Sequence, residues 1–190
     1  PLEVILKFPK EESQETNEDH DWGDEDEDNS KYWFTKDKID KIDKVHNYLE
    51  NLDHVGKVLS FSSILKVAES LNNNKPLGGL EIGVLYTKLP ENIKREIVTP
   101  YVSIDDSEAR ISLRLKDSNK DLRRNELIKK INSDLKNEIK LSEDEYKLAG
   151  VLIIFNNLLQ SLFKSQILTL GFVILGIFFM FIILFRNLKL

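Results

Sequence analysis

The sequence predicts an α+β domain followed by one transmembrane α-helix. Short segments in which apolar and polar residues alternate indicate β-strands, and apolar residues at three- and four-residue steps indicate amphipathic helices. From Ile167 to Phe185 no residue carries a charge, and the strongest polar group is the hydroxyl of Thr169. As a helix this stretch would be roughly 28 Å long, close to the roughly 30 Å hydrocarbon core of a bilayer.

The first half of the chain alternates predicted strands and helices. In the first strand, Val4, Leu6 and Phe8 share one face, and in the first helix the apolar residues recur at helical spacing. The predicted elements are a strand at Leu2–Phe8, a helix from the N-cap Thr35 to about Leu52, a strand at Val55–Phe61, and helices at Ile64–Leu71 and Leu80–Leu89.

The second half contains the clearest strand of the chain. In "EARISLRLKD" the residues Ile111, Leu113 and Leu115 alternate with polar residues, which predicts one buried and one solvated face. Asp121 is predicted to cap a helix that extends to about Ile139, and Tyr146–Gly150 is a short final strand.

With the middle helices set aside, the predicted order is β-α-β-β-α-β. This is the ferredoxin-like, split β-α-β arrangement, in which two helices cover one face of a four-stranded antiparallel sheet. The fold class is therefore α+β, a ferredoxin-like domain with extra helices, followed by one transmembrane α-helix.

Most of the negative charge lies in one segment. Residues 10–31 contain eleven acidic and two basic side chains, a local charge of −9 within a chain of net charge −5. Their apolar content is too low to offset chain entropy, so we predict a disordered acidic insert. A nucleic-acid partner is not expected, because no basic cluster beyond Arg123–Arg124 could neutralise several phosphates. The absence of cysteine from the sequence excludes disulfides and thiolate metal sites.

The domain boundaries and the orientation follow from the apolar stretch and its flanks. Residues 1–165 are predicted to form the folded domain, in which residues 151–165 are an amphipathic helix that leads into the span. Residues 166–186 form the transmembrane helix and residues 187–190 a cytoplasmic stub. Arg186 and Lys189 follow the span directly, so the positive-inside rule places the C-terminus in the cytoplasm and the domain outside. A tail-anchored protein with a cytosolic domain is the alternative.

No catalytic, cofactor-binding or metal-binding residue is predicted. Asp24, Asp26 and Asp28 alternate as at the start of an EF-hand, but Asn29 and Thr35 stand where that loop needs Gly and Glu. Weak, diffuse binding of divalent cations by this insert stays open as an alternative to a solvated segment.

The remaining polar residues suggest no active site either. The three histidines, His20, His46 and His54, lack metalloprotease spacing, and no serine or cysteine lies in a nucleophile-elbow motif. His46 and Glu50 are four residues apart on a predicted helix, so a surface pair is expected. The cluster Asp105, Asp106 and Glu108 is expected to be a turn with exposed carboxylates.

Three long stretches resemble one transporter family. They are "KIDKVHNYLENLDHVGKVLSFSSILKVAESLN", "PYVSIDDSEARISLRLKDSNKDLRRNELIKKI" and "LAGVLIIFNNLLQSLFKSQILTLGFVILGIFFMFIILFRNLKL". They are similar to predicted exporters of the RND superfamily, the resistance–nodulation–division and MMPL-like group. The resemblance covers nearly the whole chain, and it implies the first extracytoplasmic porter domain followed by transmembrane helix 2.

The resemblance also implies a function. It predicts proton-driven export of hydrophobic or amphipathic molecules such as lipids, sterol-like compounds or drugs, with no cofactor and no covalent chemistry. The expected location is the cell inner membrane, with residues 1–165 in the periplasm. The expected partners are the bilayer, the remainder of the transporter chain and further copies in a homo-oligomer. Substrate is expected in an apolar cleft between this domain and its counterpart, near Ile64–Leu89. The span lacks ionisable residues, so it would transmit motion rather than relay protons.

Two further hypotheses remain at the level of sequence. The chain begins at Pro1 without an initiator methionine or signal peptide, so we expect it to be a segment of a longer protein. The alternative is a single-span, membrane-anchored sensory, binding or scaffold protein. A third hypothesis is a module in which the acidic insert responds to calcium or polycations.

Overall fold

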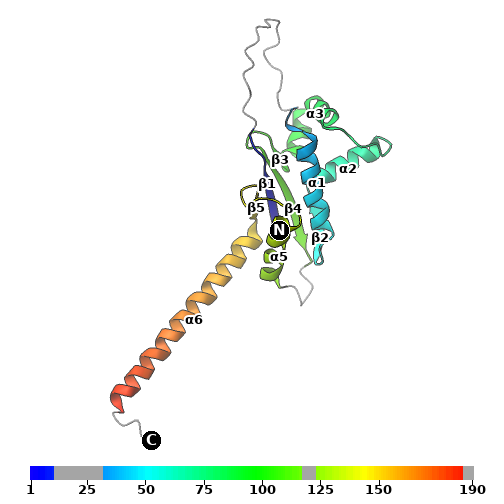
Figure 1. The fold of residues 1–190 in the computed structure, drawn as a ribbon. Helices are drawn as coiled ribbons and strands as arrows, with labels where there is room; N and C mark the ends of the chain where they lie inside the picture. The colour runs from blue at the N-terminus through cyan, green and yellow to red at the C-terminus, as the bar shows by residue number, and fades with distance from the viewer. Residues whose placement is uncertain (11–31, 117–122, 186–190) are drawn as a thin grey trace. The chain divides into compact units, whose positions relative to one another are not determined.

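The structure is a computed structural model that describes residues 1–10, 32–116 and 123–185. The chain divides into two compact units, Pro1–Gly150 and Val151–Leu190 (Figure 1). The predicted acidic insert beyond Lys10, the helix cap at Asp121 and the cytoplasmic stub lie outside the described residues.

The first unit is built on one antiparallel sheet of five strands with the order β2-β4-β1-β5, in which β3 also pairs with β4. The strands are β1 (Leu2–Lys7), β2 (Val55–Leu59), β3 (Val102–Ser103), β4 (Glu108–Leu115) and β5 (Tyr146–Ala149). The four predicted strands are confirmed, and β3 was not predicted. The second strand ends at Leu59 rather than at Phe61, because Ser60 caps the next helix.

Alternating residues bury one face of the sheet. Leu2 lies opposite Leu113 and Val4 opposite Ile111 in the pairing of β1 with β4, and all four side chains are fully buried. Such cross-strand apolar pairs stabilise a sheet when they lie on its covered face. The register therefore places the most apolar residues of two distant segments in a common core.

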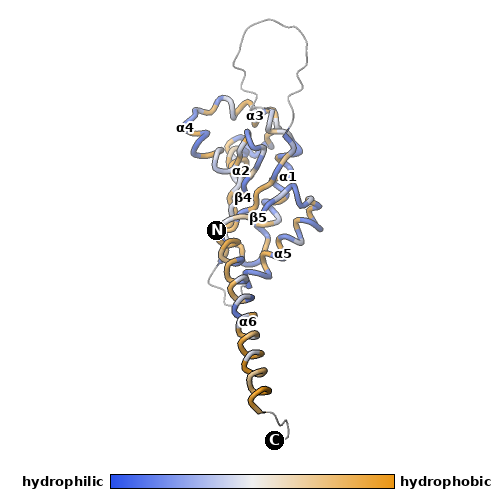
Figure 2. Tube along the Cα trace, turned by 90° about the vertical axis from the view of Figure 1, so that its left-hand side faces the viewer, coloured by the Kyte–Doolittle hydropathy of each residue, from blue (hydrophilic) through white to orange (hydrophobic). Residues whose placement is uncertain are grey.

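Helices α1 (Lys36–Glu50) and α5 (Arg124–Asn137) supply the other half of this core. The hydroxyl of Tyr48 on α1 donates a hydrogen bond of 2.6 Å to Asp134 on α5, so the two helices lie side by side (Figure 2). Their buried apolar residues recur at helical spacing, as the sequence predicts. These are Ile42, Val45 and Leu49 on α1, and Leu127, Ile131 and Leu135 on α5.

A group of shorter helices connects β2 to β3. It contains α2 (Phe61–Leu71), α3 (Gly79–Lys88), α4 (Glu91–Ile93) and the π-helix η2 (Lys94–Val98). The first two correspond to the predicted helices at Ile64–Leu71 and Leu80–Leu89. The α4 and η2 turns were not predicted, since three to five residues are too few to show a periodic pattern.

The second unit is one helix, α6 (Val151–Leu184), of 34 residues. Among the described residues it is long and apolar enough to cross a membrane, and none of the most apolar part of it is buried. Figure 2 shows its hydrophobic colouring along most of its length. Residues 151–165, which the sequence pattern places in the domain, belong to the same helix and unit as the apolar stretch.

Candidate ligand-binding site

An apolar cavity of about 320 Å³ lies within the group of helices that connects β2 to β3. Among the described residues that line it, Tyr86 alone carries a polar atom in its side chain. The lining comes from α2, α3, α4 and η2 and from the connections between them. It consists of Phe61, Ile64, Leu65, Val67, Ala68, Leu71, Leu77, Ile82, Leu85, Tyr86, Leu89, Ile93, Ile97 and Val98.

The wall that α2 forms depends on how that helix begins. The Ser60 hydroxyl accepts a hydrogen bond of 3.1 Å from the Ser62 amide, and the Ser63 hydroxyl accepts one of 3.3 Å from the Ser60 amide. This reciprocal capping box satisfies amides that the first turn would otherwise leave unpaired. Apolar residues at three- and four-residue steps, from Phe61 to Leu71, then form one continuous apolar stripe.

The opposite wall, α3, is held in place by a close backbone contact. A Cβ at Gly79 would lie 2.4 Å from the carbonyl oxygen of Phe34, so no side chain fits between α3 and this segment. The Phe34 ring lies 5.3 Å from the ring of Phe61 and 5.1 Å from that of Tyr86, between centroids. Phe61 and Tyr86 both line the cavity. The Phe34 ring thus packs behind two aromatic residues of the lining and connects the segment before α1 to α2 and α3.

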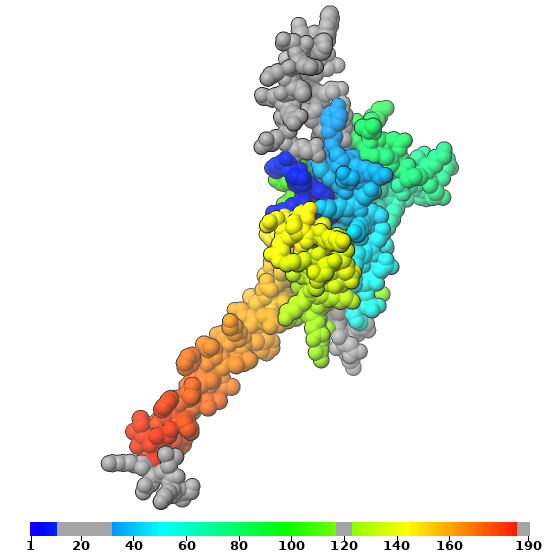
Figure 3. All heavy atoms as spheres, viewed as in Figure 1, coloured from blue at the N-terminus to red at the C-terminus, as the bar shows by residue number. Residues whose placement is uncertain are grey.

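Exposed apolar side chains surround the cavity. Within the described part of residues 1–150, the large apolar residues that are exposed, apart from Tyr32, all belong to these helices. Leu71 and Leu80 are 84% and 81% exposed. Figure 3 shows these segments, in green and teal, projecting at the edge of the domain. Exposed apolar patches on folded domains mark binding surfaces more often than single exposed residues do. Besides Leu71 and Leu80, the exposed large apolar residues of these helices are Val67, Val84, Leu85 and Ile97.

One buried cation lies beside the cavity wall. Lys94, on η2, is only 7% exposed, and its ammonium nitrogen lies 4.7 Å from the centroid of the Tyr86 ring. A cation at this distance is attracted by the ring quadrupole. The same nitrogen lies 2.8 Å from a carboxylate oxygen of Glu91, whose side chain is 80% exposed. A positive charge is therefore held against an aromatic residue of the lining.

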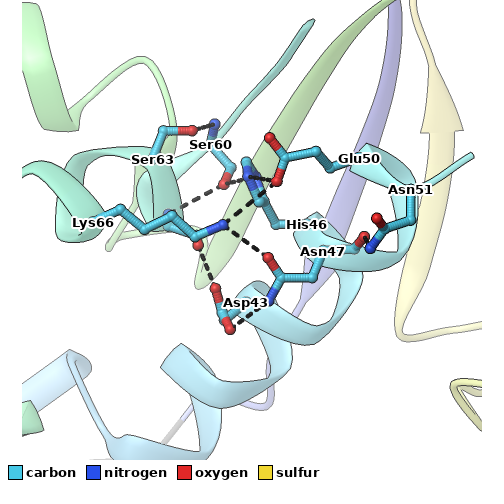
Figure 4. A network of polar contacts seen from close by, with 9 residues as sticks. Asp43, His46, Asn47, Glu50, Asn51, Ser60, Ser63 and Lys66 are labelled. Carbon is cyan, nitrogen blue, oxygen red and sulfur yellow. Dashed lines mark hydrogen bonds and ion pairs between the residues drawn. The ribbon is translucent and has the colours of Figure 1, made fainter. Parts of the chain in front are cut away.

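A polar network connects α1 to α2 next to this site (Figure 4). His46 is 2% exposed, so the prediction that it forms a surface pair with Glu50 is wrong, because the histidine is buried. Its Nε2 does lie 3.6 Å from Glu50, while its Nδ1 lies 2.9 Å from the Ser60 hydroxyl. Burial lowers the pKa of His46, the Lys66 ammonium lowers it further, and Glu50 and Asp43 oppose this.

This network resembles a serine–histidine–carboxylate arrangement only in its residue types. Ser60 is fully buried, and its oxygen already accepts the Ser62 amide, so no substrate reaches it. Ser62 in turn donates a hydrogen bond of 2.5 Å to Asp43. The network thus fixes the first turn of α2 to α1, and through it one wall of the cavity.

The other polar residues singled out from the sequence lie apart from the cavity. Asp105 and Asp106 are exposed in the turn before β4, as expected, and Glu108 pairs with Lys7 at 3.7 Å. His54 adopts a positive φ of 69° in the turn after α1. Among the described residues, no group of three or more His, Cys, Asp and Glu could hold a metal ion. The EF-hand-like aspartates and His20 lie outside the described range.

Part of the cavity lining falls in the range that the sequence suggests for a substrate cleft. The range Ile64–Leu89, expected near a substrate cleft, contributes most of the lining, and all of the lining comes from helices of this domain and their connections. Phe61, Ile93, Ile97, Val98 and Lys94 were missed. The apolar residues at 93, 97 and 98 lie in α4 and η2, which are too short to show a periodic pattern in the sequence. No protein-family model, no curated protein and no solved structure matches the chain.

Proposed function

We propose that this chain is part of a proton-driven RND/MMPL-type exporter, in which it captures hydrophobic or amphipathic molecules. It corresponds in this proposal to the first porter domain and transmembrane helix 2. The observation that carries the proposal is the apolar cavity of about 320 Å³ in the folded unit, surrounded by exposed apolar residues. A concave, mostly apolar site with few polar groups is the form that small-molecule binding sites take.

The α6 helix supports the membrane part of the proposal. It exceeds the length that a span requires, and Lys164 is the one charged residue in its sequence from Val151 to Leu184. Between Ile167 and Phe185 there is no carboxylate or imidazole to carry a proton. The proton path of such an exporter would therefore use other helices, and α6 would couple their motion to the porter domain. The domain lies in the periplasm and the helix in the inner membrane.

The ferredoxin-like arrangement belongs to the same proposal. It is supported by the element order, β-α-β-β-α-β once the inserted helices and β3 are set aside. It is also supported by the strand order β2-β4-β1-β5, in which all neighbouring strands are antiparallel. The cavity would then lie in helices added to that arrangement between its second and third strands.

Transport by the full-length protein tests this function. Reconstituted into vesicles, it is expected to move a fluorescent amphiphile when a proton gradient is imposed and to stop when a protonophore collapses the gradient. Ala68→Phe, which fills the cavity, is expected to lower the transport rate. Ser133→Phe is the matched control, because Ser133 is exposed on α5 and lies outside the lining. Absence of gradient-dependent movement for every amphiphile tested would rule out the exporter.

A single-span binding protein is the second candidate. It is favoured by the fact that the whole cavity lies inside one folded unit, so binding needs no counterpart domain. In that case the protein binds an amphiphile, Ala68→Phe abolishes binding, and a proton gradient has no effect.

A further inference from the structure

Helix α3 has a solvent-exposed stripe that is apolar in the middle and charged toward both ends. Leu80, Val84 and Leu85 are exposed, and so are Glu81 and Lys88. Residues three, four or seven positions apart lie on one side of a helix, so these five side chains form a single stripe. The other side of α3 packs on the domain through its buried residues.

The two charges of this stripe lie symmetrically about its apolar centre. Glu81 comes three residues before Val84, and Lys88 comes three residues after Leu85, so about two helical turns separate the charges. If a second α3 packs antiparallel across the centre, Glu81 of each copy faces Lys88 of the other. A parallel second helix would place like charges side by side. The stripe is therefore complementary to itself in one orientation only.

Both charged side chains can take part in such a contact. Within the part of the chain that the structure describes, the Lys88 side chain has no ion-pair or hydrogen-bond partner. Oε2 of Glu81 accepts a hydrogen bond of 2.8 Å from the Gly78 amide, which caps α3. A carboxylate has acceptor sites on both of its oxygens, so Oε1 can also bind an ammonium group.

A groove beside the stripe gives the second helix more apolar surface to contact. Leu71, Leu77, Leu80, Val84 and Leu85 line it, between the end of α2 and α3. Exposed apolar patches of this kind on folded domains mark contact surfaces. Three of these leucines, at 71, 77 and 85, also line the apolar cavity. A second copy in the groove would therefore contact residues that form a wall of the cavity.

We propose that α3 is a contact surface between two copies of this chain, which pack their α3 helices antiparallel about a two-fold axis at Val84 and Leu85. Such an interface is isologous, with the same surface on both copies. It goes beyond the proposed function and does not depend on it. A helix of 10 residues is only about 15 Å long, so the contact buries less than the roughly 1,200 Å² of a standard stable interface. The copies therefore associate at high protein concentration and separate in dilute solution, where each α3 is exposed.

Cysteine cross-linking tests whether two α3 helices meet, since the natural sequence contains no cysteine. The full chain carrying Val84→Cys is dissolved in detergent micelles and treated with a short bismaleimide over a range of protein concentrations. A covalent dimer is expected, with a yield that rises with concentration. Lys129→Cys, at an exposed position on α5, is the matched control and is expected to give only background cross-linking. A Val84→Cys yield no higher than that of Lys129→Cys would overturn the proposal.

Charge exchange tests the orientation of the two helices. In the Val84→Cys chain, Glu81→Lys or Lys88→Glu puts like charges together at both symmetric contacts. Each is expected to weaken the association about tenfold, because two exposed ion pairs are replaced by two repulsions. Lys129→Glu, the same charge change as Lys88→Glu on another face, is expected to have no effect.

The double variant decides whether these two side chains face each other. Glu81→Lys combined with Lys88→Glu restores opposite charges at both contacts, so the cross-linking yield is expected to recover. The cap on Gly78 is lost in the double variant as well as in Glu81→Lys, so recovery cannot come from the cap. A double variant that stays as weak as the single variants, or single variants with an unchanged yield, would overturn the antiparallel contact.

Discussion

Ser60 and His46 are joined by a hydrogen bond of 2.9 Å between the serine hydroxyl and Nδ1 of the imidazole. Ser60 precedes α2 and His46 lies on α1. The contact therefore connects α1, which contributes buried residues to the core, to α2, which forms a cavity wall. Both side chains are buried. The pair therefore fixes the position of α2 through one titratable group.

The first prediction concerns pH. Burial lowers the pKa of His46 below the ordinary value of 6.5, with Lys66 adding to this and Glu50 and Asp43 opposing it. Just below pH 6.5 the unfolded chain then binds more protons than the folded one. The free energy of unfolding should fall as pH drops through 6.5, by at most about 1.4 kcal/mol per pH unit. Denaturant unfolding of the folded unit, repeated at pH values from 8 to 5, measures this free energy of unfolding.

Substitution tests whether His46 causes that slope. His46→Gln is expected to flatten the decline below pH 6.5, while His54→Gln, in the turn after α1, keeps it. At neutral pH, His46→Gln should also lower the free energy of unfolding by about 1–3 kcal/mol, because it disturbs a buried hydrogen bond. Identical slopes in the wild type and His46→Gln would show that other groups control this pH range.

A second pH range depends on Glu145. Its carboxylate lies 2.6 Å from the Lys41 ammonium and accepts hydrogen bonds from the Ser142 amide and hydroxyl at 2.8 and 3.0 Å. The pKa is lowered from 4.5 to about 2, with the Lys41 contact as the largest cause. The stabilisation is present above pH 4.5 and is lost as pH falls toward 2.

Glu145→Gln isolates this contribution. Because the Glu145 side chain is about one-third exposed, solvent screening weakens its ion pair with Lys41. We therefore expect Glu145→Gln to lower the free energy of unfolding by about 1 kcal/mol at pH 7. The difference from the wild type should disappear as pH falls below 4.5. Glu143→Gln is the control, since Glu143 pairs with Lys136 on a more exposed surface. A difference that stays constant down to pH 3 would contradict this account.

Two adjacent glycines give a matched pair of substitutions. A Cβ at Gly79 would lie 2.4 Å from the Phe34 carbonyl oxygen, whereas a Cβ at Gly78 meets nothing nearer than a Glu81 side-chain oxygen at 3.8 Å. Gly79→Ala should lower the free energy of unfolding by about 1–3 kcal/mol, because backbone must move. Gly78→Ala should change it by less than about 1 kcal/mol. Similar losses of stability in the two variants would contradict the close contact between Gly79 and the Phe34 carbonyl oxygen.

Substitution of a leucine by alanine should destabilise the domain far more in the sheet than in the exposed helices. Leu113→Ala removes a fully buried side chain of β4 and is expected to cost about 2–5 kcal/mol. Leu80→Ala, at a position 81% exposed on α3, should change stability by less than about 0.5 kcal/mol. Thermal unfolding followed by circular dichroism compares the two. A large loss for Leu80→Ala would mean that this surface is covered within the folded chain.

Cysteine labelling tests membrane insertion of α6, since the natural sequence contains no cysteine. In intact membranes, Leu175→Cys should resist a water-soluble maleimide, whereas Ser142→Cys, in the folded unit, should react. In cells, reaction of Ser142→Cys with a reagent that cannot cross the inner membrane would support a periplasmic domain. Labelling of Leu175→Cys at the same rate would contradict insertion.

The strands and the longer helices could be predicted because each buries one face with a regular period. The alternation around Ile111 and Leu113 and the helical spacing from Ile42 to Leu49 required no knowledge of the partner segment. Strand β3 could not be predicted, because two residues carry no pattern.

The candidate site depends on tertiary placement, so the sequence indicated it only in part. His46 appeared to be a surface residue because its helix neighbours Asn47 and Glu50 are polar, yet the cap of α2 reaches it from fourteen residues away. Lys94 carries no signal in the sequence, since its burial against Tyr86 depends on how η2 packs on α3.

The position of β1 inside the sheet determines when the domain can assemble during synthesis. This strand pairs with β4 on one side and β5 on the other, so Leu2 meets Leu113, and Val4 meets Leu148. No local hairpin contains it, and pairings this distant in sequence form slowly. The first strand of this domain must therefore wait for almost the whole domain to be translated. During that interval, its exposed edges are open to wrong partners.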